Sequence, residues 1–167
     1  MKINDLNVIR TRYQVVPRTL VFIKNKDKYL VIHKKKQDSF GFNKLNGVGG
    51  HIEKGEEPFE SALREIAEET GVEIRNLELA AILFIDINAN PGIQVFVFSA
   101  GFVRGEFAHS DEGDLQWMSY SEIKESKVVL SEVPELIQIC KSHKNGSKPV
   151  ILKYTYNESG ELRIVMH

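Results

Sequence analysis

Cysteine is nearly absent from this sequence, which has a single one, Cys140, among its 167 residues. One thiol cannot build a disulfide framework within the chain or a cysteine-rich zinc site. Long apolar runs are absent too, because no stretch approaches the roughly 18 consecutive apolar residues that a membrane span needs. The first residues also lack the apolar centre of a signal peptide. We therefore expect a cytoplasmic protein that does not span a membrane.

An excess of charge of one sign is likewise missing, since 22 basic side chains nearly balance 23 acidic ones and the formal net charge is -1. This balance gives no general attraction to nucleic acids or anionic membranes, and no basic stripe with interleaved aromatics stands out, so we expect no nucleic-acid partner. Linkers, low-complexity tracts and repeats are also absent, which predicts one domain over residues 1–167. Whether that domain acts as a monomer or as a homodimer stays open.

What the sequence does contain is a series of short β-branched or aromatic segments separated by turns, which predict strands. The predicted strands are 19–23, 29–33, 77–87, 93–102, 115–118, 150–156 and 162–167. Helical periodicity predicts helices at 58–70, 121–126 and 131–141, and the last of these opens a C-terminal helix and hairpin over residues 131–167. Alternating sheet and helix predicts a layered sandwich of the α/β (α+β) class.

The predicted helix 58–70 begins with Pro58, which suits the first helical position, and Gly71 after it suits a C-terminal cap. Its expected apolar stripe consists of Phe59, Ala62, Leu63, Ile66 and Thr70. Away from that stripe, Glu65, Glu68 and Glu69 fall within an arc of about 100°. Like charges near a helix C-terminus repel one another, so we expect a compensating cation there and no loss of stability when one of these charges is removed.

The acidic helix permits two interpretations. Residues 53–73 contain eight glutamates against only Lys54 and Arg64, a local charge of -6, while the rest of the chain carries +5. A solvated helix face with ordinary ion pairs is one interpretation. The other is a metal site, because carboxylate oxygens without His or Cys partners suit Mg²⁺ or Mn²⁺, and Mg²⁺ completes its octahedron with water and substrate phosphates.

The spacing of these residues resembles the signature of the Nudix hydrolases. Gly50 is followed after five residues by Glu56, and after seven more by Arg64-Glu65-Ile66-Ala67-Glu68-Glu69-Thr70-Gly71-Val72, so the signature is complete over residues 50–72. The resemblance implies a Nudix-type α/β/α sandwich with a mixed sheet. It also implies a hydrolase of nucleoside diphosphates linked to a further moiety, with Mg²⁺ as cofactor and Mn²⁺ as a substitute.

The same resemblance assigns roles along the signature. Glu65, Glu68 and Glu69 would be the metal ligands of the catalytic centre, and Arg64 would orient a carboxylate of the cluster. The residues that would support the site are Glu56, Gly50 and Gly71. Several metal ions on one carboxylate face agree with what phosphoryl transfer requires, which is in-line positioning and charge neutralisation.

An acidic loop, Ser110-Asp111-Glu112-Gly113-Asp114, resembles the segment where several Nudix enzymes carry an additional metal ligand or general base. We choose Glu112 for that role. The alternative is an exposed turn, which Asp and Gly favour in any protein. Trp117, shortly after the loop, is either a core residue or a stacking surface for a ligand.

Residues 43–50, NKLNGVGG, resemble the purine nucleoside triphosphatases of the MutT type, although Leu45 stands where those usually have an aromatic residue. The predicted substrate contacts from this segment and its neighbours are Asn46, Gly49, Gly50, His51 and Arg18. His51 replaces a frequent Lys, so that it either touches phosphate or only caps the loop. The basic run 34–36 either attracts a polyphosphate or is a solvated loop.

Together these features predict a Mg²⁺-dependent Nudix pyrophosphohydrolase whose substrate is a purine nucleoside triphosphate, oxidised or unmodified, cleaved to a monophosphate and pyrophosphate. Hydrolysis of ADP-ribose or a nucleotide sugar is the alternative within the enzyme class. A nucleotide sensor without turnover is the alternative of another class, and the complete set of glutamates argues against it. Base and sugar contacts come from scattered residues and cannot be assigned from spacing.

Overall fold

The computed structural model describes residues 12–35, 41–86, 90–107, 112–156 and 162–166. Lys36, the first part of the acidic loop (110–111) and the turn 157–161 lie outside the described residues. In chain order the elements are β1 (Val15–Asn25), β2 (Lys28–Lys34), β3 (Leu45–Asn46), α1 (Pro58–Glu69), β4 (Glu73–Asp86), β5 (Gly92–Arg104), β6 (Gly113–Ser119), α2 (Tyr120–Glu125), α3 (Val133–Ser142), β7 (Val150–Tyr156) and β8 (Leu162–Met166).

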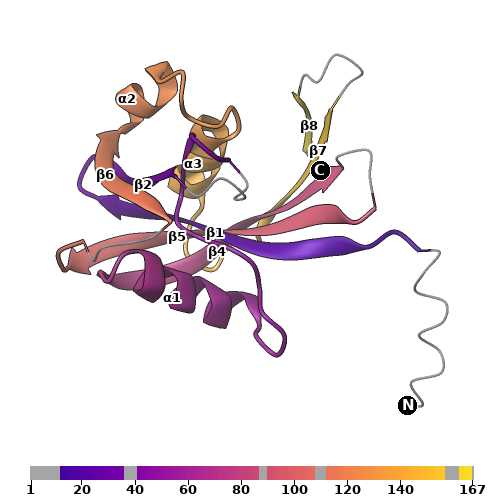
Figure 1. Ribbon diagram of the computed structural model, residues 1–167, viewed down its shortest axis with the longest axis horizontal. Coiled ribbons are helices and arrows are strands. Elements are labelled where there is room, and N and C mark those ends of the chain that lie inside the picture. Colours follow the sequence, from indigo (N-terminus) through magenta and orange to yellow (C-terminus); the bar gives the residue numbers. More distant parts are fainter. Residues whose placement is uncertain (1–11, 36–40, 87–89, 108–111, 157–161, 167) are drawn as a thin grey trace.

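The described strands form one mixed sheet of eight strands in the order β3-β2-β1-β5-β4-β7-β8, with β6 paired to β2. The pairs β1–β5 and β4–β7 are parallel, and the remaining pairs are antiparallel. In Figure 1, α1 covers one face of the sheet while α2 and α3 cover the other. The predicted α/β/α sandwich with a mixed sheet is therefore confirmed.

Each face of the sheet has its own apolar core, because successive side chains of a strand point to opposite faces. Leu20 and Phe22 of β1 belong to the cluster that packs beneath α2 and α3, and Cys140 of α3 is buried in that cluster. Val21 and Ile23 belong to the cluster beneath α1. The strand β1 thus joins the two cores and fixes α1 in place.

The predicted strands are all present, and several are longer than expected. β1 begins at Val15 because residues 15–18 pair in parallel with residues 92–95 of β5, a partner far away in the sequence. β4 begins at Glu73, and irregularities in its pairing with β5 allow it to continue through a segment without strict alternation. The two-residue strand β3 was not predicted, since it exists only through its pairing with Ile32 and His33 of β2.

The expected apolar stripe of α1 is correct only in part. Ala62 and Ile66 are buried, whereas Phe59 and Leu63 remain 41% and 51% exposed. Glu69, which we expected on the side away from the core, is buried instead. The helix is rotated so that part of its acidic face lies against the sheet, and this rotation requires polar partners for the buried carboxylate.

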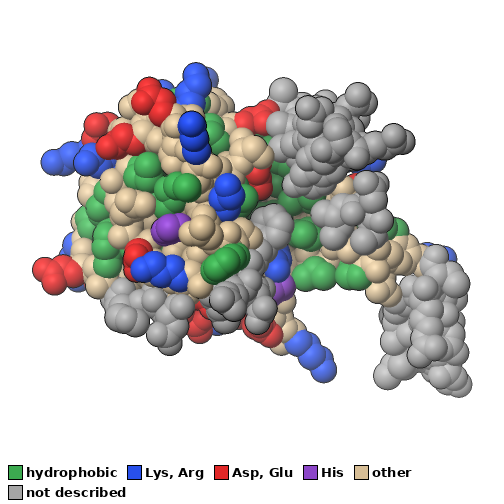
Figure 2. All heavy atoms as spheres, turned by 45° about the horizontal axis from the view of Figure 1, so that its top comes forward, with side chains coloured by type: hydrophobic (Ala, Val, Ile, Leu, Met, Phe, Trp, Pro, Cys, Tyr) green, Lys and Arg blue, Asp and Glu red, His purple; other side chains and the backbone are tan. Residues whose placement is uncertain are grey.

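The face of the molecule drawn in Figure 2 shows no strong segregation of charge. On the face drawn in Figure 2, the described Lys and Arg side chains are scattered singly among Asp, Glu and apolar groups. Within the described ranges, no helix has both the length and the apolar character to cross a membrane.

Candidate active site

The glycine-rich loop of residues 47–52 is held between β1 and α1 by backbone hydrogen bonds. Val21 and Val48 exchange two of them, with N–O distances of 2.7 and 3.1 Å, and the Thr19 N–H donates to the Gly50 carbonyl at 3.0 Å. Such an antiparallel bridge leaves little freedom to the loop. The backbone of Gly49 and Gly50 is therefore fixed directly opposite the acidic face of α1.

Both glycines are required by close approach. A β-carbon on Gly49 would lie 2.2 Å from the carbonyl oxygen of Thr19, and its φ of +146° is strained for any other residue. A β-carbon on Gly50 would lie 2.4 Å from Oε1 of Glu65. Gly49 thus serves the packing of the loop on β1, and Gly50 makes room for a carboxylate of the site.

The helix that carries the acidic residues has well-formed ends. Glu57 is the N-cap and forms a capping box with Glu60, and Pro58 occupies the first turn. At the other end Gly71 has a φ of +68° and donates to the carbonyl oxygens of Ile66 and Ala67. These caps fix where α1 begins and ends, and hence where its glutamates lie along β1.

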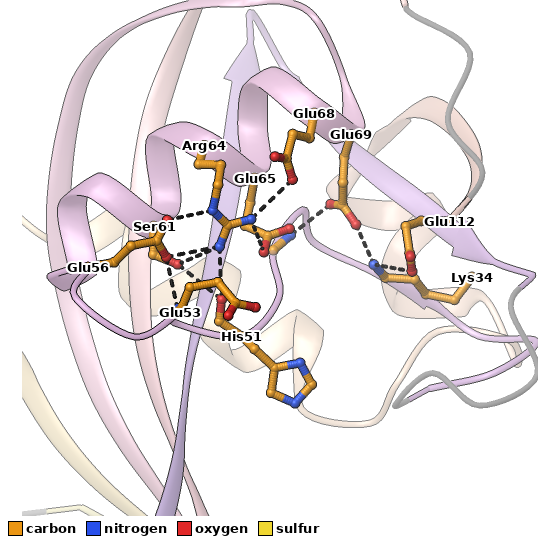
Figure 3. Close-up of polar contacts among 11 residues, drawn as sticks. Lys34, His51, Glu53, Glu56, Ser61, Arg64, Glu65, Glu68, Glu69 and Glu112 are labelled. Atoms are coloured by element: carbon orange, nitrogen blue, oxygen red, sulfur yellow. Dashed lines mark hydrogen bonds and ion pairs between the residues drawn. The ribbon is translucent and has the colours of Figure 1, made fainter.

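Arg64 lies at the centre of the acidic face (Figure 3). Its Nε and Nη2 donate to the two oxygens of Glu56 at 2.6 and 3.0 Å. Its Nη1 donates to Glu65 at 2.9 Å and to Glu68 at 3.1 Å, and Nη2 also reaches the carbonyl oxygen of His51 at 3.0 Å. One planar guanidinium therefore orients three carboxylates and the loop at once.

Glu56 forms the outer support of this arrangement. Its Oε2 accepts the N–H of Glu53 at 2.9 Å, so that it closes the turn before α1 as well as holding Arg64. The hydrogen bonds from Arg64, and next that from the Glu53 backbone, lower the pKa of Glu56 to about 2. The carboxylate of Glu56 is consequently ionised at neutral pH. The same contacts raise the pKa of Arg64, which is its counterion.

A second cation holds the other end of the acidic face. The side chain of Lys34, from the end of β2, is only 8% exposed, and its Nζ lies 2.5 Å from Oε1 of Glu69, which is 4% exposed. The backbone N–H of Gly49 donates to Oε2 of Glu69 at 2.9 Å. The cation that we expected near the helix C-terminus is thus Lys34, supplied from a strand rather than from the helix.

The three signature glutamates differ in environment. Burial is the main cause that raises the pKa of both Glu65 and Glu69, against the opposing effect of Arg64 on the first and Lys34 on the second. Glu68 has a 62% exposed side chain. Among the described residues no group of three His, Cys, Asp or Glu side chains converges as a ready ligand set. The three carboxylates nevertheless share one side of one helix (Figure 3).

Arg18 and His51 form a second pair on the loop side of the site. Nη2 of Arg18 donates to Nε2 of His51 at 2.7 Å, across an antiparallel bridge between the two residues. Burial, and next the neighbouring guanidinium, lower the pKa of His51. The imidazole is therefore neutral at neutral pH and accepts a hydrogen bond from Arg18, and both side chains lie beside the glycine-rich loop.

Glu112 lies on the other side of Lys34 from Glu69, with its Oε2 3.9 Å from Nζ of Lys34. Asn46 lies in β3 and accepts the N–H of Gly47 at 2.8 Å, a local turn contact that stabilises the start of the loop. Trp117 packs against Phe102 and Phe107 and joins the cluster beneath α1, which agrees with the core interpretation.

Lys34 is the residue of this region that sequence analysis assigned least well. In a run of three lysines it is indistinguishable from a solvated basic loop, an interpretation that fits the 57% exposed side chain of Lys35. Strand alternation could have indicated that Lys34 is buried, because Leu30, Ile32 and Lys34 share one face of β2 and the first two are fully buried.

Known proteins share both the sequence pattern and the fold of this chain. The sequence model of the NUDIX domain matches residues 15–136. An oxidized purine nucleoside triphosphate hydrolase from Danio rerio is 33% identical over 69% of this chain and 73% of its own length, and the Mus musculus protein of the same name is 29% identical over 84% and 93%. The crystal structure of a MutT protein from Bacillus halodurans superimposes with a TM-score of 0.70 over 91% of this chain and 97% of its own, at 23% identity.

The chain belongs to the NUDIX domain family. It is accordingly a Nudix hydrolase, an enzyme that acts on the pyrophosphate bonds of nucleotides. Nudix hydrolases generally use a divalent metal ion, and their substrates are small nucleotides.

Proposed function

We propose that this enzyme hydrolyses a purine nucleoside triphosphate, oxidised or unmodified, to the monophosphate and pyrophosphate with Mg²⁺ as cofactor. The observation that carries the proposal is the array of Glu65, Glu68 and Glu69 on one side of α1, oriented by Arg64 and Lys34. The choice of substrate class follows the two relatives named oxidized purine nucleoside triphosphate hydrolase.

The donor atoms of the site fit a hard divalent cation. Glu65, Glu68 and Glu69, with Glu112 as a further ligand or as a base, offer carboxylate oxygens only, which suit Mg²⁺ or Mn²⁺ and not zinc. Their partners are the side-chain cations Arg64 and Lys34 and one backbone N–H, so without a metal ion the negative charge of the site is compensated only in part. When bound, the metal would neutralise phosphate charge and lower the pKa of a coordinated water.

The remaining residues bind and orient. Arg64 is engaged by three carboxylates and the loop carbonyl, so its part is to position ligands rather than to contact substrate. Arg18 and His51, beside the loop backbone of Gly49 and Gly50, offer donors to a polyphosphate. Glu112 is placed beside Lys34, where it would act as an extra ligand or accept a proton from the attacking water.

A turnover panel tests the proposal. Purified enzyme with Mg²⁺ is assayed on 8-oxo-dGTP, dGTP, ATP, ADP-ribose and a nucleotide sugar, with separate readouts for pyrophosphate, phosphate and monophosphate. We expect the highest kcat/KM for a purine triphosphate, with equal amounts of monophosphate and pyrophosphate. The matched blank is Glu68→Gln, which removes an exposed charge from the site without touching the core.

Preference for ADP-ribose over every triphosphate would overturn the substrate assignment, and lack of turnover on any nucleotide would overturn the proposal as a whole. The chain is also proposed to work as one domain, since β7 of the C-terminal hairpin pairs with β4 of the common sheet. A cytoplasmic location stays a prediction, and the choice between a monomer and a homodimer stays open.

A further inference from the structure

Lys34 is buried and ion-paired inside the candidate metal site, and the reaction proposed above uses it only to orient Glu69. Lysine is almost never fully buried unless it is paired, because an ammonium loses its hydration on burial. Here Nζ lies 2.5 Å from Glu69 and 3.9 Å from Glu112, so that it stands between two of the four proposed ligands (Figure 3).

Both oxygens of Glu69 are occupied in this arrangement. Oε1 accepts from Lys34, and Oε2 accepts the N–H of Gly49. Gly49 is fixed by its close approach to the backbone of Thr19, whereas the ammonium of Lys34 sits at the end of a flexible four-carbon chain. A divalent ion bound to Glu69 would repel the nearby ammonium, and this flexible group would move away more readily than the amide.

We propose, on the basis of the proposed function, that Lys34 is an internal counterion that competes with the divalent metal for Glu69 and so sets the metal affinity of the site. In the metal-free enzyme it compensates the buried carboxylate and stabilises the fold. In the metal-bound enzyme it leaves Glu69, and its positive charge opposes the bound ion. Metal binding is thereby weakened, and the metal-free state is kept folded.

The test compares two single-charge variants at neighbouring positions, Lys34→Gln and Lys35→Gln. Lys35 is exposed and pairs with Asp114 at the surface, so both variants lose the same net charge but only one loses the buried pair. Mg²⁺ and Mn²⁺ binding is measured by calorimetry without nucleotide, at about pH 8.5, well above the ordinary pKa of a carboxyl group. We expect Lys34→Gln to bind the metal about 10-fold more tightly, and Lys35→Gln to differ from the parent by less than about 2-fold.

Stability of the metal-free enzyme supplies a second readout. Lys34→Gln should melt below the parent without metal and should gain more than the parent when Mg²⁺ is added, because the metal replaces the missing charge. Lys35→Gln should follow the parent in both conditions. A variant with tighter metal binding and unchanged metal-free stability would contradict the second half of the proposal.

A measurement on the parent enzyme keeps the test independent of how well the variant folds. With ¹⁵N-labelled lysine, a buried ion-paired ammonium exchanges its protons slowly and gives an observable NMR signal. We expect one such signal from Lys34 in the metal-free enzyme and its loss as Mg²⁺ is added. Persistence of that signal at saturating Mg²⁺ would overturn the proposed displacement.

The outcomes separate the two proposals. If the parent binds metal and turns over nucleotide but Lys34→Gln binds the metal equally or more weakly, the inference about Lys34 is wrong while the proposed function stands. If the parent binds no divalent metal, both are wrong.

Discussion

The carboxylate of Glu65 occupies the space that a β-carbon of Gly50 would need, with only 2.4 Å between that position and Oε1. Gly50 therefore contributes to the site by having no side chain, which leaves room for Glu65. Gly49, its neighbour, is constrained by backbone instead, since its β-carbon would lie 2.2 Å from the carbonyl oxygen of Thr19. The two adjacent positions thus require glycine for different physical reasons, so substitutions at Gly49 and Gly50 should have different consequences.

Gly50→Ala should leave the fold nearly intact and impair activity, because the obstructing group is the flexible end of Glu65, which can move aside. We expect kcat to fall by at least about 10-fold, since a displacement of about 1 Å is costly at a reaction centre. Gly49→Ala should instead lower the melting temperature, because neither the φ of +146° nor the Thr19 backbone can adjust cheaply.

Thermal melting and steady-state kinetics of the two variants check this contrast. Equal losses of stability in both would show that the Glu65 contact has no special place in the site.

Glu68→Gln and Glu69→Gln should both lower kcat by at least about 100-fold through depletion of the metal site. Their stabilities should differ. Glu68 is exposed, so Glu68→Gln should leave metal-free stability unchanged or slightly raised. Glu69→Gln leaves the buried ammonium of Lys34 without its counter-charge and should cost about 2 to 3 kcal/mol. Urea unfolding in metal-free buffer measures the difference, and a Glu69→Gln variant as stable as the parent would show that the buried pair contributes little.

The pH dependence of stability should report the Glu56–Arg64 contact. The pKa of Glu56 is lowered from 4.5 to about 2 in the folded enzyme, so the folded state binds its proton less readily than the unfolded state does. Its stabilising contribution is complete above pH 4.5 and disappears as the pH falls toward 2. The parent and Glu56→Gln should therefore differ most in unfolding free energy at about pH 6 and converge in acid. A difference that stays constant down to about pH 2 would mean that Glu56 is not held as an anion by Arg64.

The local fold was predictable because it depends on neighbouring residues. The β-branched and aromatic run of β1 and the signals of Pro58 and Gly71 at the ends of α1 are short-range patterns, and the structure contains the strand and the helix that they predict. The parallel pairing of β1 with β5 and the strand β3 were not predictable, since they depend on partners that no local pattern identifies. The same limit applies to the site, where Lys34 meets Glu69 across 35 residues and Arg18 meets His51 across 33.

The rotation of α1 could not be predicted from the sequence, for a related reason. Phe59 and Leu63 have the right spacing for a buried stripe, so periodicity alone places them inside. Which face of the helix is buried also depends on the polar partners available. The Lys34 ammonium and the Gly49 amide donate hydrogen bonds to Glu69 and so offset the free-energy cost of burying its carboxylate. This orientation of the helix thus involves a charge that lies 35 residues away in the sequence.

Divalent metal should raise the melting temperature of the enzyme, because an ion that binds the native carboxylates and not the unfolded chain stabilises the fold by mass action, by about 2.7 kcal/mol at 100 times Kd. Sodium chloride at equal ionic strength should reproduce only the screening part of the shift. Glu125→Gln, an exposed change on α2, is the control that should retain the full Mg²⁺ shift, while Glu69→Gln should lose most of it. Identical shifts with Mg²⁺ and sodium would argue against a specific site.

The position of water attack should be the α-phosphorus of the triphosphate. If the Arg18–His51 pair and the loop backbone of Gly49 and Gly50 bind the outer phosphates, the departing group is pyrophosphate and the nucleotide leaves as its monophosphate. Hydrolysis in ¹⁸O water, followed by mass spectrometry of both products, should place the label in the monophosphate. Label in pyrophosphate would mean attack at the β-phosphorus and would contradict this assignment. The Arg18→Gln variant adds a second check, since the loss of a phosphate-binding donor should raise KM more than it lowers kcat, whereas a purely structural role would lower the melting temperature with KM unchanged.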